Sequence, residues 1–324
     1  MSRILVTGGS GFVGRSLIRL LTENSISVRA TYHGAIPVFQ DQDNSAIDWV
    51  KYDLGNAHNN YSELLDGVET VIHLAGLAHV MDKDVQSPEI FRKINVEGTR
   101  KLATEAASRG VKRFIFLSTI KAHGEKSYSS DDGTIRPFME KDNPAPQDPY
   151  AESKLEAELA IKDVCDKSQM RYVILRPSLI YGPHVKANFL RLVDLVSKGI
   201  PLPFGSIKNR RSLLYVDNLG YAVLTSLEKP EAANNIYLVS DTDVSLPQLI
   251  REIAKHFDKK AEIFQFPVVL LRLAGKITGK GAVIDRLTES LVIDNSKIRH
   301  ELQWEPKVTF EGGIKNTIEW YKNR

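Results

Sequence analysis

The chain has 324 residues, of which 42% are hydrophobic and 26% are charged, and its net charge is +3. These values are ordinary for a globular protein of one large or two modest domains, and the scattered basic residues give no reason to expect a nucleic-acid partner. The single cysteine, Cys165, excludes an intrachain disulfide framework, and we expect no metal site. No secretory signal precedes the first strand and no apolar run approaches the ~20 residues of a membrane span. We therefore expect a soluble cytoplasmic protein without a membrane partner.

Short apolar runs alternate with amphipathic stretches through the first half of the chain. This alternation predicts βαβ units, and hence an α/β fold with a Rossmann-type, doubly wound parallel sheet and helices on both faces. The expected strands are 4–7, 28–32, 48–52, 70–74, 113–118 and 172–176, and the expected helices include 12–23, 90–108, 151–167 and 215–228.

The character of the chain changes after Arg176, where glycine and proline become frequent and the expected helices become shorter. This change predicts a smaller α/β C-terminal lobe that closes over the carboxyl ends of the strands and binds substrate. We expect residues 1–177 and about 210–240 to form the dinucleotide-binding domain. Residues from about 178 to 209 and from 241 to 324 would then form the substrate lobe.

Three glycines lie where the first expected strand meets the first expected helix. Gly8 suits a tight turn, Gly11 lets a pyrophosphate approach the backbone, and Gly14 allows helix and strand to pack closely. The helix N-terminus would present unpaired N–H groups and a partial positive charge to the phosphates. In this context the glycine pattern predicts a dinucleotide site at Gly8, Ser10, Gly11, Phe12, Val13 and Gly14.

The end of the second expected strand bears on the choice of cofactor. Residues 29–33 lack the acidic side chain that usually binds the adenosine ribose, and Arg29 or His33 could contact a 2′-phosphate. Both NAD and NADP are therefore compatible with the sequence, with a slight preference for NADP(H). Asp53, after the third expected strand, is expected either to bond the adenine or to cap a helix.

Tyr150 and Lys154 are four residues apart at the start of an expected helix, so their side chains share one face. A nearby ammonium favours the phenolate and lowers the pKa of a tyrosine, which can then exchange a proton with a substrate hydroxyl during hydride transfer. Ser118 and Thr119 end the fifth expected strand, and either hydroxyl could bond the reacting oxygen.

Taken together, these residues resemble the extended short-chain dehydrogenase/reductases, which include nucleotide-sugar epimerases, dehydratases and ketoreductases. The resemblance implies that Tyr150, Lys154 and Thr119 are catalytic, and it places His123 where the family usually has tyrosine. It runs in the family's order through Gly8–Gly14, His73–Gly76, Asn95–Thr99, Ser118–Thr119, Tyr150–Lys154 and Arg176–Pro177. To the cofactor site it adds Tyr32, Asp53, Leu54, Leu74, Ala75, Gly76, Asn95, Tyr150, Lys154 and Pro177.

The second half resembles the nucleotide-sugar binders of this family and implies a UDP-sugar substrate. Arg211 matches an arginine that contacts the diphosphate, a role that suits its bidentate fork. Arg286 is either a second such arginine or an ordinary surface salt-bridge residue. The implied substrate contacts are His79, Lys121, His123, Lys186, Asn188, Phe189, Pro203, Arg211 and Arg286.

Within the family, residues 77–81, 120–125 and 185–190 most resemble the UDP-N-acetylquinovosamine dehydrogenases, 4-ketoreductases of bacterial surface-polysaccharide synthesis. The resemblance also implies a homodimer through helices 90–108 and 151–167. A UDP-glucose or UDP-N-acetylglucosamine 4-epimerase with retained NAD shares the catalytic pair and is the nearest alternative. A 4,6-dehydratase is disfavoured because no carboxylate follows Thr119 until Glu125. A non-catalytic dinucleotide sensor would need neither Tyr150 nor Lys154, and the chain retains both.

Overall fold

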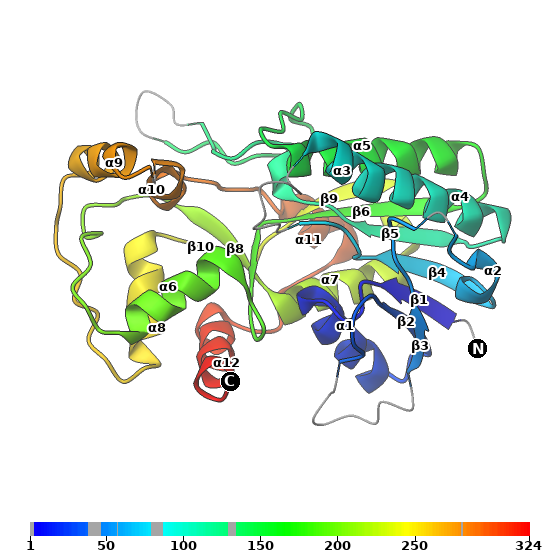
Figure 1. The fold of residues 1–324 in the computed structure, drawn as a ribbon, viewed down its shortest axis with the longest axis horizontal. Helices are drawn as coiled ribbons and strands as arrows, with labels where there is room; N and C mark the ends of the chain where they lie inside the picture. The colour runs from blue at the N-terminus through cyan, green and yellow to red at the C-terminus, as the bar shows by residue number, and fades with distance from the viewer. Residues whose placement is uncertain (1–2, 38–46, 57, 79–86, 129–133, 280) are drawn as a thin grey trace.

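The computed structural model describes residues 3–37, 47–56, 58–78, 87–128, 134–279 and 281–324. Its central sheet has seven parallel strands in the order β3-β2-β1-β4-β5-β6-β9, so the strand order reverses between β1 and β4 (Figure 1). The expected Rossmann-type sheet is therefore confirmed. For each of the six predicted strands, both the first and the last residue lie within two positions of the observed ones. The strands are β1 (Arg3–Thr7), β2 (Val28–Tyr32), β3 (Asp48–Lys51), β4 (Val68–His73), β5 (Arg113–Leu117), β6 (Arg171–Pro177) and β9 (Asn235–Val239).

Helices cover both faces of this sheet (Figure 1). Leu17, Leu219 and Ile298 come from three different helices and belong to one core cluster on the first face. Leu102 and Ile161 belong to the cluster on the other face. The first layer contains α1 (Phe12–Glu23), α7 (Val216–Glu228) and α11 (Ser296–Leu302), and the second contains α2 (Tyr61–Leu64), α4 (Thr99–Ser108) and α5 (Pro149–Asp166).

The expected helix over 90–108 is present, but it begins two residues earlier and contains a π-helical stretch. The structure has α3 (Pro88–Phe91), a π-helical segment (Arg92–Gly98) and then α4. Gly98 lies so close to Leu54 that a Cβ added there would be 2.4 Å from the Leu54 carbonyl oxygen. π-Helical turns are rare and are frequent at functional sites. Here the segment brings Gly98 against the loop after β3 and contains Asn95, whose side chain bonds Leu77 and Ser153.

The second lobe is built on a three-stranded sheet in the order β10-β8-β7. Tyr181, Phe189 and Leu213 help to form its separate core. The strand β6 runs through Ser178 directly into β7, so the carboxyl edge of the large sheet adjoins this lobe. Its elements are β7 (Leu179–Tyr181), β8 (Arg211–Tyr215), β10 (Thr242–Val244), α6 (Ala187–Ser197), α8 (Leu246–Lys255), α9 (Val268–Ile277), α10 (Gly281–Thr288) and α12 (Phe310–Lys322). Two 3₁₀ turns, Ile120–Ala122 and Pro230–Ala232, complete the described chain.

Candidate active site

The glycine turn has the backbone geometry that an anion site needs. Gly8 has a φ of +72°, which favours glycine, and its N–H donates to Thr31 Oγ1 over 3.0 Å. A Cβ on Gly14 would lie 2.3 Å from the Gly8 carbonyl oxygen, so only glycine fits. Gly11 begins α1, and no side chain in the described part of the chain caps that helix. The first N–H groups of α1 are therefore available to a phosphate.

The loop after β4 lies directly against this turn. A Cβ on Gly8 would be 2.8 Å from the Ala75 backbone nitrogen, and the Leu74 N–H donates to the Thr7 carbonyl over 3.2 Å. A Cβ on Gly76 would lie 3.9 Å from Lys154 Nζ. The structure therefore brings the glycine turn, residues 74–76 and Lys154 to one edge of the sheet.

Asn95 holds this loop against α5. Its Oδ1 accepts from the Leu77 N–H over 2.7 Å. Its Nδ2 donates to the Leu77 carbonyl over 3.0 Å and to Ser153 Oγ over 2.9 Å. The side chain is 2% exposed. Asn95 therefore positions the loop and α5 rather than offering a free amide to the cofactor.

Arg29 is not available to a 2′-phosphate, contrary to the expectation from the sequence. It is 7% exposed, and its Nε donates to Asp48 Oδ2 over 2.7 Å. Its Nη1 donates to the carbonyls of Glu63, Leu64 and Asp66. These acceptors hold the guanidinium inside the protein, because a buried cation needs partners.

The other predicted cofactor residues that follow β2 and β3 lie near one another. Tyr32 ends β2 and is half-buried, and Leu54 is buried just beyond β3. Asp53 Oδ1 accepts from the Gly55 N–H over 3.0 Å and so closes a turn, whereas the helix cap anticipated as one of two possibilities is provided by Asn60 at α2. Its other oxygen lies 3.7 Å from His33 Nε2. A carboxylate thus reaches this end from β3 although β2 supplies none.

Helix α5 presents the predicted catalytic pair. Asp148 caps the helix by accepting from the Ala151 N–H over 2.7 Å, which places Tyr150 in the first turn. Lys154 is 4% exposed, and its Nζ lies 3.9 Å from the centroid of the Phe116 ring. Burial lowers the pKa of Lys154 to about 7, while the Glu158 carboxylate acts in the opposite direction.

The pKa of Tyr150 is raised rather than lowered in this structure. Burial and, to a smaller extent, the negative charge of Asp148 raise it to about 12. The sequence led us to expect that the nearby lysine would lower this pKa, but burial and Asp148 both shift it upward. Tyr150 therefore needs a further positive charge at the site before it can act as a base near neutral pH.

The two hydroxyls at the end of β5 have different environments. Ser118 is 4% exposed and donates to Glu158 Oε1. Thr119 is half-buried, and its Oγ1 accepts from the Lys121 N–H over 3.3 Å, which leaves its own O–H free to donate. Lys121 Nζ is held by Glu125 over 2.6 Å and by Asp148 over 2.5 Å. Thr119 is thus the better placed hydroxyl.

A buried polar network that we did not predict lies behind α5. Arg176 donates to Glu158 Oε1 over 2.9 Å and to Glu158 Oε2 over 2.5 Å, and these side chains are 3% and 1% exposed. The Nη1 of Arg176 also lies 3.2 and 3.1 Å from the two ring nitrogens of His123. The available sequence signal was Glu158, which stands one helical turn beyond Lys154 on the same face.

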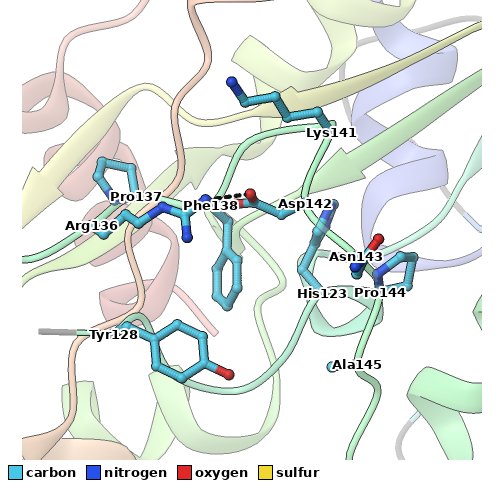
Figure 2. A pocket seen from close by; sticks show the side chains of 10 residues that line it. All are labelled: His123, Tyr128, Arg136, Pro137, Phe138, Lys141, Asp142, Asn143, Pro144 and Ala145. Carbon is cyan, nitrogen blue, oxygen red and sulfur yellow. Dashed lines mark hydrogen bonds and ion pairs between the residues drawn. The ribbon is translucent and has the colours of Figure 1, made fainter.

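His123 is buried at the inner end of this network. It is 1% exposed, and burial together with the charge of Arg176 lowers its pKa to about 4. Its ring borders a cavity of about 460 Å³ beside Phe138, Asp142 and Asn143 (Figure 2). The predicted contact between His123 and substrate would therefore have to be made from this buried position.

The predicted substrate residues of the second lobe fall into two groups. Arg211 Nη1 donates to the carbonyl of Arg286 over 2.8 Å and to that of Glu289 over 3.3 Å, so the two arginines are brought together. Lys186 precedes α6, a helix that no described side chain caps, and Asn188 in its first turn is exposed. Phe189 is buried against Tyr181, and Pro203 is half-buried. Pro177, which the resemblance adds to the cofactor site instead, is buried. His79 lies outside the described residues.

Comparisons with known proteins show the family. Residues 4–240 match the NAD dependent epimerase/dehydratase family. A UDP-glucose 4-epimerase of Vibrio cholerae is 41% identical over 324 residues, which cover 98% of this chain and 94% of that protein. A dTDP-D-glucose 4,6-dehydratase of Mus musculus is 28% identical and covers 99% of this chain and 88% of its own length. The structure of a UDP-glucose 4-epimerase from Thermotoga maritima with UDP-glucose superposes with a TM-score of 0.78 at 25% identity, covering 99% of both chains. The chain belongs to the NAD-dependent epimerase/dehydratase family of enzymes, as its resemblance to the extended short-chain dehydrogenase/reductases implied.

Proposed function

We propose that this enzyme transfers hydride at carbon 4 of a UDP-sugar, with NAD or NADP as cofactor and Tyr150 as the acid/base. The observation that carries the proposal is the position of Lys154. Its buried ammonium lies one helical turn from Tyr150 and beside residue 76 of the loop that adjoins the glycine turn. The relatives named as UDP-glucose 4-epimerases support the substrate class.

Three side chains would share the proton chemistry. Tyr150 exchanges a proton with the oxygen on carbon 4, and Lys154 stabilises the phenolate through its charge. Thr119 donates its free O–H to the same sugar oxygen and so orients it. A bound nicotinamide would supply or accept the hydride and, when oxidised, would add a positive charge that favours the Tyr150 phenolate.

The open N-terminus of α1 fits a dinucleotide diphosphate, because no described side chain caps its first N–H groups, and the glycine turn beside it lets the phosphates approach the backbone. We place the dinucleotide on residues 1–177 and about 210–240. The engagement of Arg29 and the approach of Asp53 to His33 favour NAD, since a 2′-phosphate would find a carboxylate and no free arginine there. These contacts weigh against the preference for NADP(H) drawn from the sequence.

Residues from about 178 to 209 and from 241 to 324, together with Arg211 on the adjoining strand β8, would hold the UDP-sugar. The Arg211 guanidinium donates to the backbone carbonyl of Arg286, and the two arginines offer two cations to a diphosphate. Lys186 and the uncapped N-terminus of α6 offer a second positive region. A nucleotide-sugar carries the two negative phosphates that such a surface would neutralise.

Two courses of reaction use these residues. Epimerisation at carbon 4 returns the hydride to the opposite face of the sugar, and the 41% identity to a UDP-glucose 4-epimerase favours it. Reduction of a 4-keto sugar consumes the reduced cofactor, and the sequence resemblance of residues 77–81, 120–125 and 185–190 favours it. Reduction adds a hydride to carbon 4 and a proton to its oxygen, whereas epimerisation first removes both and then returns them.

A hydride-balance assay separates the two courses. Purified protein is mixed with UDP-N-acetyl-4-keto-6-deoxyglucosamine and NADH or NADPH, and separately with UDP-glucose or UDP-N-acetylglucosamine without added reductant. Stoichiometric loss of reduced cofactor establishes a ketoreductase, whereas formation of the 4-epimer without reductant establishes an epimerase. Retention of bound dinucleotide with turnover of neither substrate would instead support the sensor alternative.

A further inference from the structure

Exposed apolar side chains gather on one part of the second lobe. The described residues include eleven large hydrophobic side chains that are exposed, and six of them lie between positions 264 and 283. Four belong to α9, namely Val269 (76% exposed), Leu270 (47%), Leu273 (53%) and Ile277 (78%). Single exposed hydrophobic residues are ordinary, but a cluster on one helix marks an interaction surface. We call these four residues the α9 face.

The α9 face is one distinct side of its helix. At about 100° per residue, the four side chains fall within a single arc of roughly a quarter turn. The opposite side packs into the lobe, since Leu271 and Gly275 are buried and a Cβ on Gly275 would lie 2.7 Å from Ile284 Cγ1 of α10. The helix is therefore fixed to the protein along one side and turns its apolar side outward.

Two cations border this apolar arc. Arg272 and Lys276 are both exposed and stand on the helix between the α9 face and the buried side. Arg272 also reaches Asp285 at 3.8 Å, a long contact in which both side chains remain about half exposed. Around the axis of α9, the buried residues are therefore followed by the basic residues and then by the exposed aliphatic residues.

This order fits a lipid surface better than a protein partner. Protein interfaces are enriched in aromatic residues, methionine and arginine and are depleted in lysine, whereas the α9 face is aliphatic and has Lys276 at its border. A helix that lies in a membrane interface buries aliphatic side chains below the headgroups and places basic residues among anionic phosphates. We infer that the α9 face docks this enzyme on the surface of a membrane that contains anionic lipids.

The contact would be peripheral. None of the helices in the described part of the chain is long and apolar enough to cross a membrane. Helix α9 lies at the end of the molecule opposite α4 (Figure 1). The α4–α5 surface that we predict to form the homodimer would therefore stay free. The inference does not depend on the reaction proposed above, because membrane binding is measured without substrate.

Vesicle flotation tests the inference directly. The full chain is mixed with vesicles of phosphatidylcholine alone, or of phosphatidylcholine containing phosphatidylglycerol, and the fraction that floats is measured. We expect flotation with the anionic vesicles and about tenfold less with the neutral ones, because a single short helix needs both apolar burial and charge attraction. Protein that remains unbound with the anionic vesicles would overturn the inference.

Two double variants and one control identify the surface. Leu273→Asp with Ile277→Asp should abolish flotation, and Arg272→Glu with Lys276→Glu should abolish the preference for anionic vesicles. Ile200→Asp alters an exposed residue outside the α9 face (47% exposed) and should float like the wild type. Circular dichroism establishes that each variant is folded. The inference is wrong if the Leu273→Asp/Ile277→Asp variant floats like the wild type. It is also wrong if the wild type never floats and the variant differs only in a smaller oligomer mass by light scattering.

Discussion

Behind α5, both carboxylate oxygens of Glu158 accept hydrogen bonds from the Arg176 guanidinium, over 2.9 and 2.5 Å. The pair is almost completely buried, and Ser118 donates to the same carboxylate. Glu158 is also the group whose negative charge opposes the loss of a proton from Lys154. The network thus joins the end of β5, the end of β6 and the charge state of the proposed catalytic lysine.

Replacing Glu158 with glutamine should therefore change the pH dependence of catalysis. Loss of the negative charge lowers the pKa of Lys154 below its value of about 7, so less of the lysine is cationic at neutral pH. We expect kcat/KM at neutral pH to fall about fivefold, with the alkaline limb of the profile moved by about one pH unit toward acid. Steady-state rates across pH measure this shift.

The matched control is Glu156→Gln on the same helix, since Glu156 is 47% exposed and pairs with Arg92 over 3.1 Å. It should leave the profile unchanged. A Glu158→Gln enzyme that loses activity equally at every pH would show that Glu158 has only a structural role, and thermal melting would identify simple unfolding.

Tyr150→Phe should reduce turnover by about 10²- to 10⁴-fold, the usual contribution of a general acid/base. Phenylalanine keeps the ring that packs 6.3 Å from Phe91, so the fold and cofactor binding should survive. The absorbance of the phenolate also reports on the site. The difference in phenolate absorbance between the wild type and Tyr150→Phe, followed across pH, should give a pKa of about 12 without cofactor. It should give a lower pKa with oxidised dinucleotide. Turnover within a few-fold of the wild type would refute the assigned role.

Arg211→Lys should raise KM for the UDP-sugar about tenfold with little change in kcat, because lysine loses the planar fork that binds a diphosphate at two points. Arg210→Lys is the matched control, since Arg210 is exposed and pairs with Asp243 over 3.0 Å. Initial rates against substrate concentration separate the two constants. An equal loss of kcat in both variants would argue against a binding role for Arg211.

Asp241 should make stability depend on pH. Burial raises its pKa to about 6, and its Oδ1 has no hydrogen-bond partner in the described structure. A folded-state pKa above the unfolded value means that this contribution to stability is present below about pH 4 and is lost as the pH rises through about 6. Relative to Asp241→Asn, the unfolding free energy of the wild type should fall by about 3 kcal/mol between these limits. Denaturant unfolding at each pH tests this, and a constant difference would contradict it.

The order of elements and the chemistry of the turns could be predicted from the sequence. The alternation of short apolar runs with amphipathic stretches predicted six of the seven strands of the large sheet. The spacing of the glycines located the turn that contains Gly8 and Gly14. The Tyr150–Lys154 spacing likewise placed both residues on α5. These features depend on neighbours a few residues apart, so the local pattern contains the information they need.

The remaining features depend on residues that are distant in the chain. Arg29 appeared free for a phosphate until β3 placed Asp48 beside it, and the raised pKa of Tyr150 reflects burial that no local spacing reveals. Glu158 and Arg176 meet only because α5 packs behind β6. The sequence by itself therefore determined the Rossmann order and the proposed catalytic pair. Only the tertiary structure decided which charged groups are already neutralised and which remain for a ligand, because desolvation and long-range pairing arise when the layers pack.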